Sequence, residues 1–164
     1  MYTSDVRKKE GCVMVIAFCG HSRYGGSLED EKKILELLKQ KAENEAVEFF
    51  LGGYGGFDQF AYHCAWKFQK EHTDAKLILI TPYLDTKHYA DDIKDRFDSI
   101  IYPELEKIPL KYAIVHRNRW IVEKADIIIA YVKNQYGGAY TMYQYAKRKK
   151  KEIYNIADQN ENRQ

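Results

Sequence analysis

The sequence predicts an α/β fold in which a mostly parallel sheet lies between two layers of helices. Apolar runs of strand length alternate with segments of helix length along the whole chain. The runs are rich in Val and Ile and show little polar alternation, as do strands that are buried on both faces. The 164 residues are expected to form one domain, 1–164, with frayed ends at 1–10 and 157–164.

Six strands are expected, each on a short apolar or β-branched run. In chain order they are Val13–Phe18, Val47–Leu51, Lys76–Thr81, Ser99–Tyr102, Ile127–Val132 and Glu152–Ile156. The first belongs to the longest apolar run of the chain, Cys12–Phe18. We therefore expect it in the centre of the sheet, beside the point where the strand order reverses.

The segments between the strands carry helix signals. Leu28–Glu43 and Phe57–Glu71 repeat apolar residues at helical spacing. Pro109 is placed as the first residue of a helix that runs to about Lys124, and Tyr140–Lys150 closes on cations, which suit a helix C-terminus. Residues 82–108 are less regular and are expected to form a surface helix and a connection.

Composition excludes several classes of protein. Lys plus Arg total 26 and Asp plus Glu total 24, so a formal charge of +2 gives no general affinity for polyanions. The longest apolar run is far below the roughly 20 residues of a membrane span, and no signal peptide is visible. Three cysteines without C-x-x-C spacing indicate free thiols in the cytoplasm. The histidines have no metal-ligand spacing, and neither a metal nor a cofactor is expected.

Three glycine-containing loops each follow a predicted strand: Phe18–Gly26, Leu51–Ala61 and Asn134–Thr141. In a parallel sheet they meet at the carboxyl edge, where ligands bind, and their N–H groups at helix starts suit an anion. Asp58 and Thr141 are placed to cap the helices that follow. Neither a dinucleotide fingerprint nor a P-loop occurs. The glycines alone are consistent with simple tight turns, but three such loops on one edge favour a phosphate-bearing ligand.

The segment HRNRW, His116–Trp120, puts polar residues into a helix with an otherwise apolar face. Spacing alone favours a solvated face for Arg117 and Arg119, and a satisfied core position for Asn118. The basic run Lys147–Lys151 is most simply a solvated helix end.

Two motifs resemble a known superfamily. The segment GGYGGFDQFAYHCA resembles the S-G-x-A-x-G-I-D-x-x-A-H segment of DNA-processing protein A (DprA), and RNRW followed by AD, IIIAYV and a glycine loop is similar to that family's R-N-R-I-I region. Arg117 lies nine residues before Asp126, as in the lonely-guy phosphoribohydrolases. The chain thus resembles the SLOG superfamily, most of all its small stand-alone bacterial members. The resemblance implies a Rossmann-like fold of three α/β/α layers that binds nucleotides or their derivatives.

One departure from the resemblance bears on catalysis. The lonely-guy hydrolases keep an acid just after their Gly-Thr turn, where this chain has Tyr143 and Gln144. Cleavage of an N-glycosidic bond needs a carboxylate, for which Asp58, Glu123 or Asp126 would have to substitute.

The sequence therefore favours a cytoplasmic protein that binds a nucleotide or a nucleotide-derived small molecule, with a sensor role left open, over an enzyme. The alternatives are a nucleoside-monophosphate phosphoribohydrolase and a DprA-like binder of single-stranded DNA; a nucleic-acid partner is not favoured, and a membrane partner is not expected. The tyrosine and tryptophan content predicts a homodimer. The predicted ligand-binding residues are Gly20, Ser22, Arg23, Gly52, Gly53, Gly55, Gly56, Asp58, Arg117, Asn118, Gly137, Gly138 and Thr141.

Overall fold

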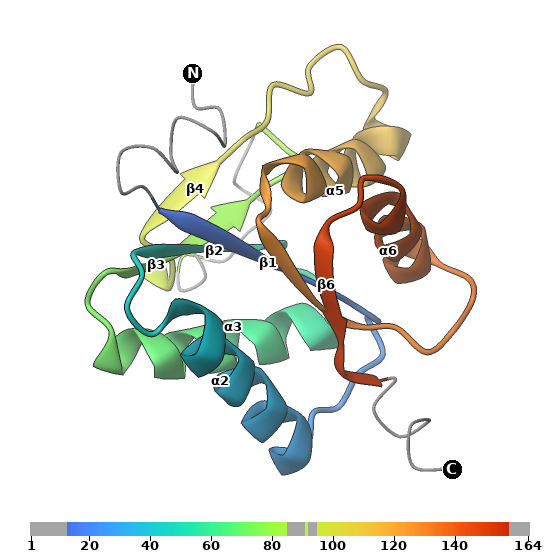
Figure 1. Ribbon diagram of the computed structural model, residues 1–164. Coiled ribbons are helices and arrows are strands. Elements are labelled where there is room, and N and C mark those ends of the chain that lie inside the picture. Colours follow the sequence, from blue (N-terminus) through green and yellow to red (C-terminus); the bar gives the residue numbers. More distant parts are fainter. Residues whose placement is uncertain (1–12, 85–90, 92–94, 158–164) are drawn as a thin grey trace.

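The computed structural model describes residues 13–84, 91 and 95–157, which fold around one parallel sheet (Figure 1). The sheet has six strands in the order β4-β3-β2-β1-β5-β6. The strands are β1 (Met14–Gly20), β2 (Val47–Leu51), β3 (Ala75–Ile80), β4 (Ser99–Ile101), β5 (Ile127–Tyr131) and β6 (Glu152–Asn155). The predicted α/β class is confirmed, and β1 lies in the centre, where the strand order reverses between β1 and β5.

Helices cover both faces of the sheet. They are α2 (Leu28–Ala42), α3 (Gly55–Glu71), a 3₁₀ turn η2 (Leu110–Tyr112), α5 (Ala113–Lys124) and α6 (Gly138–Arg148). Figure 1 shows α2 and α3 on one face and α5 and α6 on the other. Side chains of β1 alternate between the two cores: Ile16 and Phe18 join the core under α2 and α3, whereas Ala17 joins the core under α5 and α6. Burial on both faces explains the unbroken apolar run of this strand.

Three predicted helix starts were wrong. The first is that of α3, which begins at Gly55 rather than at Phe57. Pro109 is not the first helical residue, because its ψ of 138° is extended and only the 3₁₀ turn separates it from α5. The last helix begins at Gly138 rather than at Tyr140, because the chain turns into it at Gly137 with a φ of 91°. Thr141 therefore lies inside the first turn and is not a cap.

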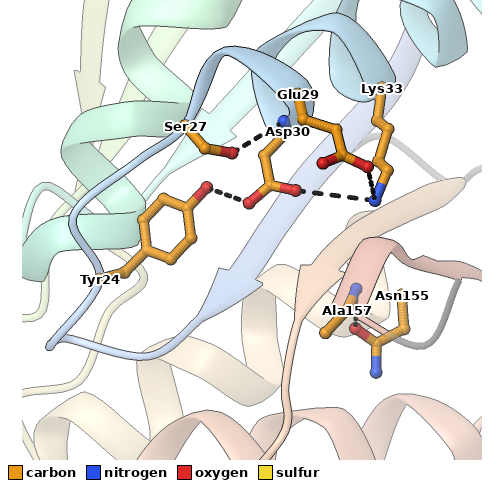
Figure 2. Close-up of polar contacts among 7 residues, drawn as sticks. All are labelled: Tyr24, Ser27, Glu29, Asp30, Lys33, Asn155 and Ala157. Atoms are coloured by element: carbon orange, nitrogen blue, oxygen red, sulfur yellow. Dashed lines mark hydrogen bonds and ion pairs between the residues drawn. The ribbon is translucent and has the colours of Figure 1, made fainter. Parts of the chain in front are cut away.

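The ends and the irregular segment are described only in part. Residues 1–10 and 158–164, expected to fray, lie outside the described residues, as do 85–90 and 92–94 of the expected surface helix. Ala157 was expected to fray but is buried, and its N–H donates to the Asn155 side chain at 3.2 Å (Figure 2). Within the described ranges, we find no helix with the length and apolar character of a membrane span.

Candidate functional site

A cleft of about 420 Å³ opens at the carboxyl edge of the sheet, over the ends of β1 and β2. Its walls come from the loop after β1, the start of α3, one face of α5, and the loop after β5 with the start of α6. It lies at the switch point between β1 and β5, where open α/β sheets bind ligands. The lining residues are Phe18, Cys19, Gly20, His21, Ser22, Arg23, Gly52, Tyr54, Asp58, Ile114, Arg117, Asn118, Ile121, Asn134, Tyr136, Gly137, Gly138, Ala139 and Met142.

The structure brings most of the predicted ligand-binding residues together in this cleft. Those that line it are Gly20, Ser22, Arg23, Gly52, Asp58, Arg117, Asn118, Gly137 and Gly138. Those that do not line it are Gly53, Gly55, Gly56 and Thr141. Sequence reasoning missed the apolar wall of Ile114, Ile121 and Met142, although Ile114 lies one helical turn before Arg117. It also missed His21 and Asn134, which belong to loops that it had singled out.

The backbone N–H groups at the start of α3 donate hydrogen bonds within the protein. The backbone N–H of Gly56 donates to the oxygen of Ser22 at 2.7 Å, and that of Phe57 donates to the oxygen of His21 at 3.3 Å. The N–H of Tyr54, the residue before the helix, donates to the Asp58 carboxylate at 3.2 Å. Asp58 thus acts one turn inside the helix, not as the predicted preceding cap. The expectation that amides of this loop hold phosphate is not supported, because these three donors are already engaged.

The start of α2 is closed to anions as well. Ser27 caps it by accepting from the N–H of Asp30 at 3.0 Å, and the hydroxyl of Tyr24 donates to the carboxylate of Asp30 at 2.6 Å (Figure 2). Lys33 reaches both Glu29 and Asp30, at 3.5 and 3.8 Å. The first turn therefore presents carboxylates. They already interact favourably with the positive end of the helix dipole, and they repel a further anion.

The start of α6 is different and faces the cleft. Its preceding residue, Gly137, makes no side-chain cap, and its first turn has no acidic residue. Gly137, Gly138 and Ala139 line the cleft, as does Arg23 from the loop after β1. Backbone N–H groups and the dipole at such a helix start attract anions. Among the starts of α2, α3 and α6, the start of α6 is thus the one suited to an anion.

Arg117 forms part of the cleft floor and is 3% exposed. Its Nη1 donates to the backbone oxygen of Gly52 at 3.0 Å and of Ile80 at 2.7 Å, and its Nε donates to Asn118 at 2.9 Å. The solvated face expected for this arginine from spacing was wrong, whereas Arg119 is exposed as expected. Arg117 joins the chain after β2 to the end of β3, so its first role is to shape the cleft.

Asp58 supplies an acid within the cleft. Burial raises the pKa of this carboxyl to about 6, against the opposing effects of the Arg117 charge and of the Tyr54 N–H. The other two acids considered from the sequence are engaged elsewhere: the carboxylate of Glu123 accepts from Tyr145 at 2.5 Å, and that of Asp126 accepts from the N–H of Val15 at 2.9 Å. Asp58 is therefore the one of these three acids that lines the cleft.

His21 ties the loop after β1 to the loop after β5. Its Nε2 accepts from the N–H of Lys133 at 2.9 Å and from that of Asn134 at 3.2 Å. Both bonds require an unprotonated Nε2, so the neutral ring carries its proton on Nδ1. Burial lowers the pKa of His21 from its ordinary value of 6.5.

Acid is expected to release the loop after β5. Because the pKa of His21 is lower in the folded than in the unfolded chain, its bonds stabilise the fold above pH 6.5 and are lost as the pH falls through the lowered pKa. We expect a loss of about 1 kcal/mol, discounted for partial exposure. The amide NMR shifts of Lys133 and Asn134 should titrate together. His21→Gln, which keeps an acceptor, should abolish the titration; shifts that still move in this variant would contradict the assignment.

Comparisons with known proteins identify the fold. No protein-family model and no curated protein matches the chain in sequence. DNA processing protein A from Streptococcus pneumoniae gives a TM-score of 0.62 at 19% identity, over 87% of this chain and 50% of that one. DprA from Helicobacter pylori, whose structure is described by its single-stranded DNA binding mode, gives 0.60 at 18% identity, over 85% and 63%. The Moco carrier protein of Chlamydomonas gives 0.52 at 15% identity, over 88% and 76%.

These likenesses confirm the Rossmann-like α/β fold that the motifs implied. The chain spans 50% and 63% of the two DprA proteins, so it corresponds to a part of each. At these identities the comparison establishes the fold, and the activity has to be argued from the cleft.

Proposed function

We propose that the cleft binds a nucleotide or a nucleotide-derived small molecule, with its phosphate at the start of α6. The observation that carries this proposal is the uncapped first turn of α6, with Gly138 and Ala139 lining the cleft together with Arg23. Amides, a helix dipole and a guanidinium together match the charge and the acceptor oxygens of a phosphate.

The rest of the cleft suits the less polar part of such a ligand. Ile114, Ile121 and Met142 form an apolar wall, and the ring of Tyr136, 73% exposed, stands at the same cleft. A base packs against apolar and aromatic side chains, while Ser22 and Asn134 offer hydrogen bonds to a ribose. The structural neighbours described as a DNA binder and as a carrier of Moco support binding as the general role. The cytoplasmic location and the homodimer stay predictions of the sequence.

Calorimetric titration with AMP tests this proposal. We expect saturable binding that inorganic phosphate displaces, and Arg23→Ala should weaken it about 3- to 10-fold, as for a partly solvated charged hydrogen bond. Lys33→Ala is the matched control, since Lys33 pairs with Glu29 and Asp30 at the closed start of α2. Equal weakening by both variants, or no competition by phosphate, would contradict a phosphate seat at α6.

A phosphoribohydrolase is the second candidate, and Asp58 is the observation in its favour. A carboxyl with a pKa of about 6 can exchange a proton near neutral pH, as a general acid or base does. The same titrated samples should be assayed for base release from AMP. The binding proposal expects release near background; fast release that falls about 10²- to 10⁴-fold in Asp58→Asn would replace it with the hydrolase.

Single-stranded DNA is distinguished by salt. A strand binder loses affinity steeply as salt rises, whereas a ligand held largely by backbone N–H groups loses much less. The same titration at two salt concentrations separates the two.

A further inference from the structure

A second groove, of about 810 Å³, lies on the other side of α5 and shares no lining residue with the cleft. Its walls are largely apolar and come from β2, from β4 and the chain after it, from α5 and from α6, with Phe50, Ile101, Leu105, Ile108 and Trp120 among them. The ring of Trp120 stacks on that of Phe50, with centroids 5.7 Å apart and planes at 12°. A partner that fills this groove must bring apolar side chains.

The rim of the groove is cationic. Around the ring of Tyr145, which lines the groove, three cationic groups gather: Arg119 at 5.5 Å, Arg148 at 5.6 Å and Lys149 at 5.5 Å from its centroid. Lys124 lies 5.9 Å from the ring of Trp120. Because like charges close together repel one another, a partner that brings several anions is favoured at this rim.

Two features favour an acidic peptide over a nucleic acid. Nucleic-acid strands stack their bases on open aromatic faces, but here Trp120 is stacked on Phe50, and cations surround the ring of Tyr145. Glu104 and Glu123 also line the groove and would repel a continuous row of phosphates. A peptide, unlike a nucleic-acid strand, carries negative charge only at its acidic residues. Its carboxylates can therefore meet the cations at the rim while uncharged residues face the two glutamates.

We propose that the groove between α5 and the chain after β4 docks an acidic, amphipathic peptide segment of a partner protein. The apolar face of the segment lies against Trp120, Leu105 and Ile108, and its carboxylates meet Arg119, Arg148 and Lys149. The same helix, α5, carries Arg117 and Asn118 in the cleft, so the partner would contact the helix that forms one wall of the ligand site. The proposal does not depend on what the cleft binds.

Tryptophan fluorescence gives a direct test. The chain has two tryptophans, and Trp66 lies on α3, on the opposite face of the sheet, so Trp66→Phe leaves Trp120 as the reporter. The probe is a synthetic peptide of about 18 residues, which spans roughly 27 Å as a helix. It carries Glu on one helical face and Leu and Phe on the other, and it contains no Trp. We expect a saturable spectral shift with a Kd of about 10–100 µM.

Charge reversal at the rim should weaken this binding. In the Trp66→Phe background, Arg119→Glu with Lys149→Glu is expected to raise Kd about tenfold, because two attractive pairs become repulsive. The control in the same background is Lys70→Glu, which reverses an exposed cation on α3, on the opposite face of the sheet. Calorimetric binding of AMP should be the same in the rim variant, which separates failure of this groove from failure of the cleft.

Three results would overturn the proposal. The first is the absence of a saturable shift at low salt. The second is equal binding of a scrambled peptide of the same composition, which has charge but no apolar face. The third is tighter binding of a single-stranded thymidine oligonucleotide than of the peptide, which would assign the rim to phosphates.

Discussion

Arg117→Ala is expected to lower the free energy of unfolding by about 3–5 kcal/mol, the range for removing one partner from a buried charged network. The side chain is 3% exposed and satisfies the backbone oxygens of Gly52 and Ile80. Its loss leaves these acceptors without that donor and removes the positive charge that opposes the raised pKa of Asp58. Chemical denaturation followed by circular dichroism measures the change.

Arg119→Ala is the matched control for this prediction. It removes the same kind of side chain two residues later on α5, where the guanidinium is exposed and lies over the ring of Tyr145. Exposed substitutions of this kind usually stay within about 0.5 kcal/mol. If Arg117→Ala proved equally mild, Arg117 would not be the residue that holds the chain after β2 to the end of β3. Its role would then have to be sought in direct contact with a ligand.

The sheet could be predicted from the sequence because strands that are buried on both faces consist of short, continuous apolar runs. Val47–Leu51 was predicted with the bounds that the structure has, and the other strands differ by a few residues at their ends. The start of α6 was missed because it depends on a positive φ at Gly137. The sequence shows two adjacent glycines, Gly137 and Gly138, but not which of them adopts the positive φ.

The position of the cleft could be predicted from the sequence, but the role of each residue in it could not. The three loops meet at one edge because their strands are parallel, and spacing in the sequence is enough to see this. The burial of Arg117 was not visible in spacing, because its acceptors, Gly52 and Ile80, lie 65 and 37 residues away along the chain. The resemblance to a known superfamily singled out Arg117 where helical periodicity favoured a solvated face.

The glycines of the second loop show the same limit. They look alike in the sequence, but they are needed for different reasons. Gly55 has a φ of +84°, whereas Gly56 has no room for a Cβ because the backbone of Ser22 and Tyr24 lies against it. Which segment comes close is a matter of tertiary structure. From the sequence, both were predicted to approach a ligand, whereas in the structure both lie beside the loop after β1.

Gly56→Ala is expected to destabilise the protein by about 3 kcal/mol, at the upper end of the range for overpacking. A Cβ at this position would collide with the backbone oxygen of Tyr24 and would lie 2.9 Å from that of Ser22. Both atoms belong to the backbone of the loop after β1, so no side chain can rotate away. The N–H of Gly56 would also lose its 2.7 Å bond to Ser22, which is worth about 1 kcal/mol. Thermal unfolding measures the loss.

Gly138→Ala provides the contrast that decides the cause. Gly138 also lies in the first turn of a helix, but a Cβ there would meet nothing within 4 Å, and its φ is not in the positive range. Alanine favours helix over glycine by about 1 kcal/mol, so this variant should be neutral or slightly more stable. A loss of stability in both variants would point to the helix starts themselves. A loss confined to Gly56→Ala ties the effect to the contact between α3 and the loop after β1, which forms one wall of the cleft.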